Sequence, residues 1–383
     1  MGVANGTIDR ATMAGSMRQS SMFPDPVDRT LAGDRAREAA MRIYFATNRA
    51  PRRGGGPDAF GGRFSPRGLT DLRFGWANFD DGDAAGLLTV EVAPERLNVP
   101  QADLERGDLS RQRLGSQMVF AAMRAEMVER CADALLFIHG FNTSFEESLR
   151  TGARLATALS ERPLVLCVFS WPSDGSLLPY LAYASDRDDA RASGVALGRG
   201  LQKLSHWLRK LPSSEHCGQG IHLLAHSMGS YALRWAWQSV RLSAGQRLRR
   251  HLDHVLLVAA DEDHDTFEHP HKLGGVADIA RSVTVYHNAR DRALMASDYT
   301  KANPERLGAG GPRNALLLPD KVRVVDCTPV VSPSEDPLGH HYHLNSPEVR
   351  QDLLAVLADV EPEAMPTRVA RTDGRGWRLR PGI

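Results

Sequence analysis

The stretch IHLLAHSMG, residues Ile221–Gly229, decides the fold. Its first five residues are almost all apolar, which indicates a buried strand, and helical spacing begins at about Ser230. Between the two, Ser227 has a small residue two positions before it and a glycine two positions after it. Small residues there allow the backbone to turn sharply and to raise the serine hydroxyl above the end of a sheet. The segment therefore predicts a nucleophilic serine on a strand-to-helix turn, at the positive end of the helix dipole.

Short apolar runs recur on both sides of this segment, each followed by a longer stretch with helical spacing. Runs that are apolar at nearly every position are typical of parallel strands buried on both faces, with helices as crossovers. The expected strands are 42–47, 87–92, 134–138, 164–170, 221–225, 254–260, 282–286 and 322–326. This order predicts an α/β protein whose mostly parallel central sheet is flanked by helices on both faces.

The composition describes a soluble globular protein, because 383 residues carry 47 Lys and Arg against 46 Asp and Glu, and 42% are hydrophobic. These values exclude a disordered chain, a collagen and a disulfide scaffold. A formal net charge of +1 gives no electrostatic reason to expect nucleic acid or an anionic membrane as a partner. The four cysteines include no Cys-x-x-Cys pair, so neither a zinc ribbon nor a dithiol redox site is indicated.

Three segments are expected along the chain. Residues 1–38 lack any periodicity and predict a flexible N-terminal arm, residues 39–361 hold the α/β domain, and residues 362–383 predict a basic, flexible tail. The longest apolar runs are far short of the roughly 18 residues that a membrane-spanning helix needs. The first 30 residues contain no apolar core of a signal peptide. We therefore expect a cytoplasmic protein without integral membrane association.

A second strand, 134–138, ends in His139 and Gly140, well upstream of the serine. In this layout the loop after that strand supplies one backbone amide to an oxyanion hole, and the residue after the nucleophile supplies the other. We therefore expect the amides of Phe141 and Met228 to hold the oxyanion, whose full negative charge needs preorganised donors. For His139 itself, a role in holding the loop by hydrogen bonds is favoured over a role as the base.

A serine nucleophile also needs an acid and a base, and the expected chain order is serine, acid, histidine. Asp291 lies in a short loop after the strand 282–286, and His340 lies just before the last helix, so that these two residues fit the order. The alternative acids are Asp261 and Asp263, followed by Asp326 and Asp336. The alternative bases are His341 and His343.

The walls of a substrate pocket are indicated in part. The pocket candidates are His139, Trp171 and Tyr180, the last in an apolar segment that fits an acyl pocket and a crossover helix about equally well. The acidic cluster 261–265 lacks the spacing of a metal site, because neither His-Glu-x-x-His nor Asp-x-Asp-x-Asp-Gly is present. We expect no metal and no cofactor.

Five segments, in order, carry a resemblance to a known family. They are YFATNR (44–49), FIHGFNTSF (137–145), FSWPS (169–173), AHSMG (225–229) and GHHY (339–342). With them the chain resembles a bacterial α/β-hydrolase family of uncertain function among the esterase/lipase-superfamily enzymes. The resemblance implies the α/β-hydrolase fold, with Ser227 as nucleophile, His340 as base and Asp291 at the position of the acid. It adds little about the substrate.

Together these features predict a serine hydrolase that cleaves carboxylic esters through a Ser-His-Asp triad and an acyl-enzyme intermediate. Its partner is then a small-molecule or lipid-like ester. An acyltransferase, or a hydrolase of amides, lactones or lipids, is an alternative, because the same triad and intermediate serve all of these reactions. A non-catalytic ligand-binding protein that keeps the fold is a second alternative. Neither the physiological substrate nor the oligomeric state follows from the sequence.

Overall fold

The structure, a computed structural model, describes residues 41–80, 83–95, 114–173, 179–244, 252–299, 305–374 and 376–382. The strands of its main sheet are β1 (Met41–Thr47), β4 (Arg73–Phe79), β5 (Leu87–Val92), β6 (Asp133–Ile138), β7 (Leu164–Ser170), β8 (Ile221–His226), β9 (Leu252–Val258), β10 (Ala280–His287), β11 (Val322–Asp326), β12 (Arg368–Ala370) and β13 (Trp377–Leu379). Within the described residues their order is β12-β13-β11-β10-β9-β8-β6-β7-β1-β4-β5. Strands β2 (Arg49–Pro51) and β3 (Phe60–Phe64) form a separate pair.

The centre of the sheet is parallel. In the part of the sheet with the order β1-β7-β6-β8-β9-β10-β11, every neighbouring pair of strands runs parallel. Strand β13 pairs with β11 in parallel as well. Strands β4, β5 and β12 run antiparallel to their neighbours at the two margins. Each predicted strand is present with bounds within two residues of the expected ones. The predicted fold class, an α/β sheet that is mostly parallel, is confirmed.

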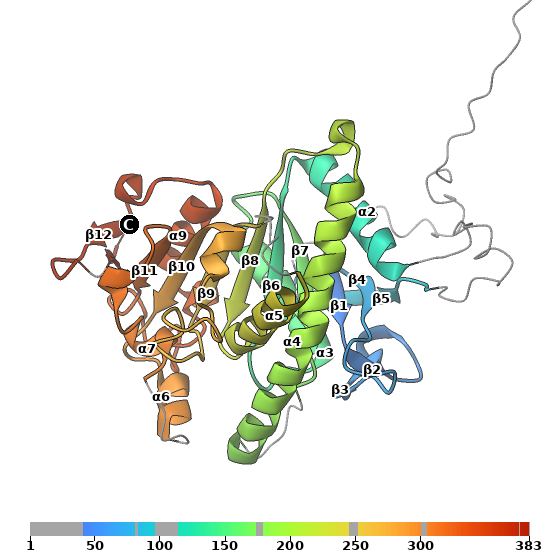
Figure 1. Cartoon of the computed structure of the whole chain (residues 1–383), viewed down its shortest axis with the longest axis horizontal. Coiled ribbons are helices and arrows are strands. Elements are labelled where there is room, and N and C mark those ends of the chain that lie inside the picture. Colours follow the sequence, from blue (N-terminus) through green and yellow to red (C-terminus); the bar gives the residue numbers. More distant parts are fainter. Residues whose placement is uncertain are drawn as a thin grey trace, which may run out of the picture. The chain divides into compact units, whose positions relative to one another are not determined.

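Helices cover both faces of this sheet (Figure 1). They are α2 (Gly115–Arg130), α3 (Phe145–Ala158), α4 (Pro179–Lys210), α5 (Gly229–Ala244), α6 (Arg292–Tyr299), α7 (Leu307–Gly310), α8 (Tyr342–Asn345) and α9 (Pro347–Leu357). Helices α2, α4 and α5 share one hydrophobic core with the sheet, and α3, α8 and α9 share the other. Alternate residues of β6 divide between the two cores, since Ile138 packs in the first and Phe137 in the second. The carboxyl ends of the central strands are thereby fixed from both sides.

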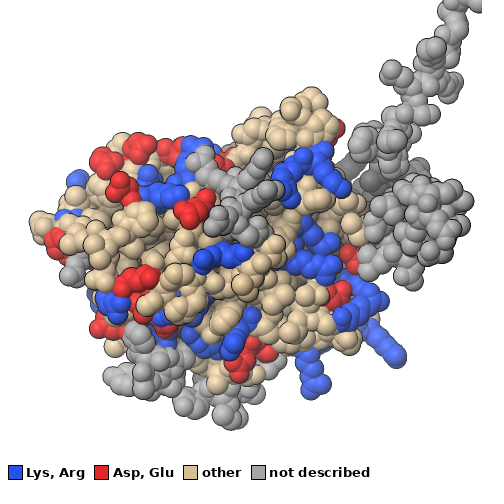
Figure 2. All heavy atoms as spheres, in the orientation of Figure 1, with Lys and Arg blue, Asp and Glu red and all other residues tan. Residues whose placement is uncertain are grey.

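The distribution of charged side chains on the surface agrees with the even charge balance of the sequence. Figure 2 shows basic and acidic side chains interspersed over the face that it presents. No helix in the described ranges combines the length and the unbroken apolar stretch needed to cross a membrane. The N-terminal arm expected over residues 1–38 lies outside the described residues.

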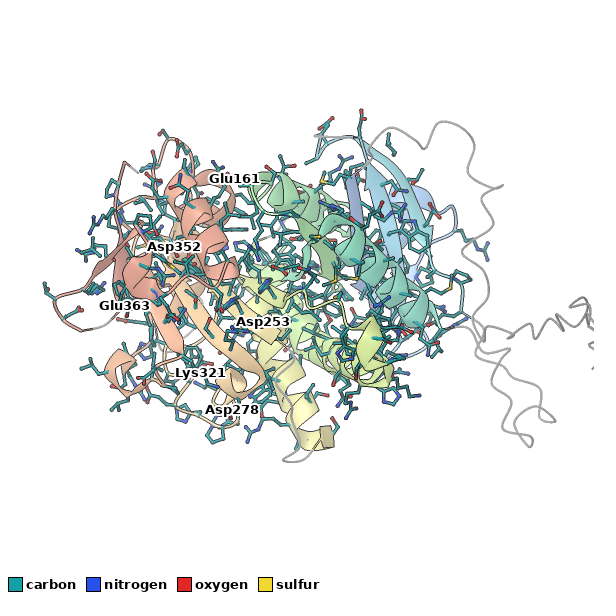
Figure 3. All side chains as sticks on the ribbon, turned by 90° about the horizontal axis from the view of Figure 1, so that it is seen from above. Glu161, Asp253, Asp278, Lys321, Asp352 and Glu363 are labelled. Atoms are coloured by element: carbon teal, nitrogen blue, oxygen red, sulfur yellow. The ribbon has the colours of Figure 1, made fainter. Side chains whose placement is uncertain are left out.

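The C-terminal segment corrects one prediction, because it is part of the sheet rather than a flexible tail. Strand β13 pairs with β11, and β12 pairs with β13. Arg368 is buried, and its guanidinium donates to both carboxylate oxygens of Asp352, at 2.8 and 2.7 Å. Figure 3 labels Asp352, which belongs to α9. Thr367 and Tyr286 donate to the same carboxylate. Arg368, one of the arginines that suggested a solvated tail, is thus the residue that anchors this segment to α9.

Arg368→Met is expected to lower the free energy of unfolding by about 3–5 kcal/mol, because it leaves the buried Asp352 carboxylate without its cation. Urea unfolding followed by circular dichroism measures the change. Arg380→Met is the matched control, because Arg380 is exposed, and it should shift the stability by no more than about 0.5 kcal/mol. Equal stabilities of the two variants would contradict the assigned anchor.

Candidate active site

Ser227 stands on the turn between β8 and α5 in a left-handed backbone conformation, with φ of 54°. Its amide donates to the carbonyl of Val258 at 3.0 Å, and its carbonyl accepts from the amide of Asp261 at 3.1 Å. A Cβ on Gly229 would lie 2.5 Å from the carbonyl oxygen of Ile138, so only glycine fits where α5 crosses the end of β6. The strand-to-helix turn expected from the sequence is therefore present, and it holds the serine in a strained conformation.

The loop after β6 passes directly over Ser227. A Cβ on Gly140 would lie 3.0 Å from the Cβ of Ser227. Next to it, the amides of Phe141 and Met228 make no hydrogen bond to any protein group in the part of the chain that the structure describes. Two unengaged amides beside one serine are the arrangement that an oxyanion hole requires.

Buried polar side chains fix the conformation of this loop. Asp186 on α4 is fully buried and accepts hydrogen bonds from the amide of Asn142, at 3.1 Å, and from the hydroxyl of Ser173. Ser173 in turn accepts from the amide of Thr143 at 3.1 Å. Arg49, also buried, donates to the carbonyl of Thr143 at 2.7 Å. The amides of Asn142 and Thr143 are thus engaged, whereas the amide of Phe141 has no protein partner among the described residues. Sequence reasoning missed Asp186 and the role of Arg49.

His139 holds the start of the same loop. Its Nε2 accepts from the amide of Trp171 at 3.1 Å, so the proton lies on Nδ1, which donates to the carbonyl of Gly140 at 2.8 Å. Burial and the nearby charge of Arg49 lower its pKa to about 3, which keeps the ring neutral. Trp171 stacks on it with ring centroids 5.0 Å apart. These contacts support the loop-holding role over the role of base.

Asp291 and His340 meet at the carboxyl edge of the sheet. The Nδ1 of His340 lies 2.7 Å from Oδ2 of Asp291, and Oδ1 of Asp291 accepts from the amide of Leu294 at 3.0 Å. Burial lowers the pKa of His340, but the charge and hydrogen bond of Asp291 outweigh it, so that this pKa is raised above its usual value. The side chain of Asn288 donates to the carbonyl of Gly339 at 2.8 Å and so ties the two loops together.

The alternative acids have other partners. Asp261 accepts from the hydroxyl of Tyr183 at 2.5 Å and pairs with Arg306 at 3.3 Å. Asp263 pairs with Arg306 at 2.8 Å and with Lys272 at 2.9 Å. Neither carboxylate makes a hydrogen bond to a histidine in the described ranges. Asp326 accepts from arginines of the C-terminal segment, and Asp336 accepts from a backbone amide.

The alternative bases belong to a cluster of imidazoles around His226. The ring of His226 lies 5.2 Å from that of His341 and 4.5 Å from that of His343. Burial, followed by the neighbouring His340, lowers the pKa of His341 to about 4. His343 is fully buried, and neither of its ring nitrogens has a hydrogen-bond partner among the described residues. Of the three candidate bases, His340 is the one whose ring contacts the carboxylate of Asp291.

A cavity of about 1090 Å³ opens at Ser227 and His340. Its wall near these residues is apolar and aromatic and is formed by Phe141, Tyr183, Ala293, Leu294 and Leu338. His139 lines it as expected, whereas Trp171 does not belong to its described lining and is fully buried behind His139. The side chain of Tyr180 lies outside the described residues. In the described ranges no three His, Cys, Asp or Glu side chains are arranged to hold a metal ion.

A mostly parallel sheet with helices on both faces and a serine on the turn after β8 define the α/β-hydrolase class of proteins. A family model described as alpha/beta hydrolase of unknown function (DUF900) matches residues 120–356, which is more than half of the chain. The chain belongs to this family. A search of curated proteins found no match.

Proposed function

We propose that the protein is a serine hydrolase that cleaves carboxylic esters, with Ser227 as nucleophile, His340 as base and Asp291 as acid. The observation that carries the proposal is the 2.7 Å contact between His340 and Asp291 at a cavity that also opens onto Ser227. A histidine that donates from Nδ1 to a carboxylate keeps Nε2 free to accept a proton, which is the state that a general base needs.

In the acylation step, Oγ of Ser227 attacks the carbonyl carbon of the ester, and its proton passes to Nε2 of His340. The carbonyl oxygen becomes an oxyanion that accepts hydrogen bonds from the amides of Phe141 and Met228. When the tetrahedral intermediate collapses, the bond to the alcohol oxygen breaks and His340 returns the proton to the departing alcohol. Asp291 stays ionised and holds the imidazole in the required tautomer.

In the deacylation step, water replaces the alcohol. His340 takes a proton from the water as it attacks the acyl carbonyl, and the same two amides hold the second oxyanion. Collapse releases the carboxylic acid and returns the proton to Oγ of Ser227. The nucleophile of acylation, the base, the acid and the two oxyanion amides are all residues of the chain.

The test of this function is covalent labelling by a serine-directed fluorophosphonate, read by mass spectrometry of the intact and digested protein, with short-chain and long-chain aryl esters assayed in parallel. We expect one label, on Ser227, and turnover of at least one ester. Product analysis with a competing alcohol separates hydrolysis from acyl transfer. A folded protein that takes no label would contradict the proposal and favour a ligand-binding protein.

Asp186→Ala is expected to lower kcat for an ester by about 10- to 100-fold with little change in KM, because the loop that aims the Phe141 amide loses its anchor. Asp186→Asn should restore most of the rate, since its side-chain oxygen still accepts from Asn142. Asp188→Ala is the control, because Asp188 is exposed on the same helix. An Asn variant as slow as the Ala variant would contradict the positioning role, as would an unchanged kcat in Asp186→Ala.

A further inference from the structure

The cavity at Ser227 continues away from the nucleophile, between α3 and the segment 341–350. Polar side chains predominate in this part of its lining, in contrast to the wall at Phe141. They are Glu147, Thr151, Arg154 and Thr157 from α3, and His341, Asn345 and Arg350 from the facing segment, with Ala158 and Leu344 as apolar neighbours. A substrate that fills the cavity therefore meets apolar side chains beside the scissile bond and polar ones farther along.

The charged side chains of the lining differ in their ion-pair partners. Apart from the histidines, the charged side chains that line it are Glu147, Arg154, Asp261 and Arg350. Glu147 pairs with Arg154, and Asp261 pairs with Arg306. Arg350 makes no ion pair with any carboxylate in the described ranges, so its guanidinium is the charged group of the lining that lacks a carboxylate partner there.

The position of the Arg350 side chain is fixed. It is half-buried, and its Nη1 donates to the carbonyl of Leu344 at 2.9 Å, which is another lining residue. A guanidinium has five N–H donors, so one bond to a carbonyl leaves several for a ligand. Its planar arrangement of donors matches the two oxygens of a carboxylate or a phosphate.

We infer that the ester substrate carries an anionic oxygen group, a carboxylate or a phosphate, which Arg350 binds while the ester carbonyl lies at Ser227. That the bound molecule is an ester cleaved at Ser227 rests on the proposed function. The binding of an anion by Arg350 does not depend on it. The uncharged donors of Thr151 and Asn345 and the lack of a compensating carboxylate favour an anion over a neutral chain end. The substrate class is then an ester with an apolar linker between its scissile bond and its anion.

Turnover is tested with pairs of esters that differ only in charge. Aryl monoesters of straight-chain dicarboxylic acids with six methylene groups are compared with the same compounds capped as methyl esters at the free carboxyl group. A second pair, the octanoyl esters of glycerol 3-phosphate and of glycerol, places a phosphate on the alcohol side. We expect kcat/KM to be about 10- to 100-fold higher for the charged member of at least one pair.

Arg350→Met should remove this preference and leave the neutral ester within about twofold of wild type, while Arg350→Lys should keep part of it. Arg323→Met is the matched control for the loss of one positive charge, because Arg323 pairs with Glu361 and does not line the cavity. Equal kcat/KM values for the charged and neutral members in wild type overturn the inference. A loss in Arg350→Met that is the same for both members overturns it as well.

Binding is tested without catalysis, so that failure of the anion site and failure of the esterase can be told apart. Calorimetry compares suberic acid monoamide with suberic diamide, on Ser227→Ala and on the Ser227→Ala, Arg350→Met double variant. We expect the monoamide alone to bind measurably, and only when Arg350 is present. Such binding without turnover of any ester supports the anion site and rejects the esterase. No binding of either compound, or equal binding, overturns the anion site.

Discussion

Ser227→Ala is expected to lower kcat for every ester that the protein hydrolyses by at least about 10³-fold, and to abolish labelling by a fluorophosphonate. The methyl group cannot attack a carbonyl carbon, and any residual rate comes only from the oxyanion amides and from substrate positioning. Side-by-side ester assays and intact mass spectrometry of wild type and variant measure both effects.

A control variant separates this effect from damage to the turn. Ser230→Ala removes another buried hydroxyl at the start of the same helix, one that donates to the carbonyl of Ala225 at 3.4 Å and does not line the cavity. It should keep its label and its turnover. Because alanine, like serine, must adopt the positive φ of position 227, Ser227→Ala should unfold within a few degrees of wild type, about 1 kcal/mol of stability or less. Ester turnover retained by Ser227→Ala would exclude this serine as the nucleophile.

The central part of the fold was predictable because its signals are local. Strands β6 to β11 are buried on both faces at most positions and so appear in the sequence as short runs that are largely apolar. Strand β4 was not predicted, because it contains Gly75, which weakens strand propensity. The structure explains that glycine: a Cβ there would lie 2.5 Å from the ring of Phe45. A glycine is needed at position 75 because a neighbouring strand lies so close, and the local sequence does not reveal that contact.

The C-terminal strands were missed for a related reason. Five arginines in 368–380 suggest a solvated segment, but three of them pair with carboxylates that lie outside it. Arg368 pairs with Asp352, and Arg371 and Arg378 pair with Asp326. Charge alone therefore predicted exposure, whereas the compensating carboxylates allow the segment to join the sheet.

The residues of the candidate site also differ in how far the local sequence predicts them. Ser227 is marked by its own neighbours in the sequence. Chain order and the family resemblance suggested Asp291 and His340, which are 49 positions apart and in contact. The sequence left His340, His341 and His343 as candidate bases, and His340 is the one in contact with Asp291. Asp186 has no local signal, because it reaches the oxyanion loop across 44 positions from a helix rich in charged residues. Positioning residues of this kind are visible only once the chain is folded.

Asp291→Asn is expected to lower kcat by about 10³- to 10⁴-fold without unfolding the protein. An asparagine amide can donate to Nδ1 of His340, which places the imidazole proton on Nε2 and leaves no acceptor for the proton of Ser227. Asp261→Asn is the matched control, because Asp261 lines the same cavity but contacts Tyr183 and Arg306 rather than His340. A larger loss in Asp261→Asn than in Asp291→Asn would transfer the role of acid to Asp261.

The pH dependence of kcat/KM gives an independent test of the same pair. The base must be neutral to accept a proton, so activity falls as the pH drops through the pKa of His340. Although burial lowers this pKa, Asp291 raises it above 6.5, so the acid limb of wild type is expected above pH 6.5. Removing the carboxylate charge leaves burial as the larger influence, and the acid limb of the residual Asp291→Asn activity should move to lower pH. A variant whose acid limb stays where that of wild type lies would show that Asp291 does not set the titration of the base, even if its kcat were low.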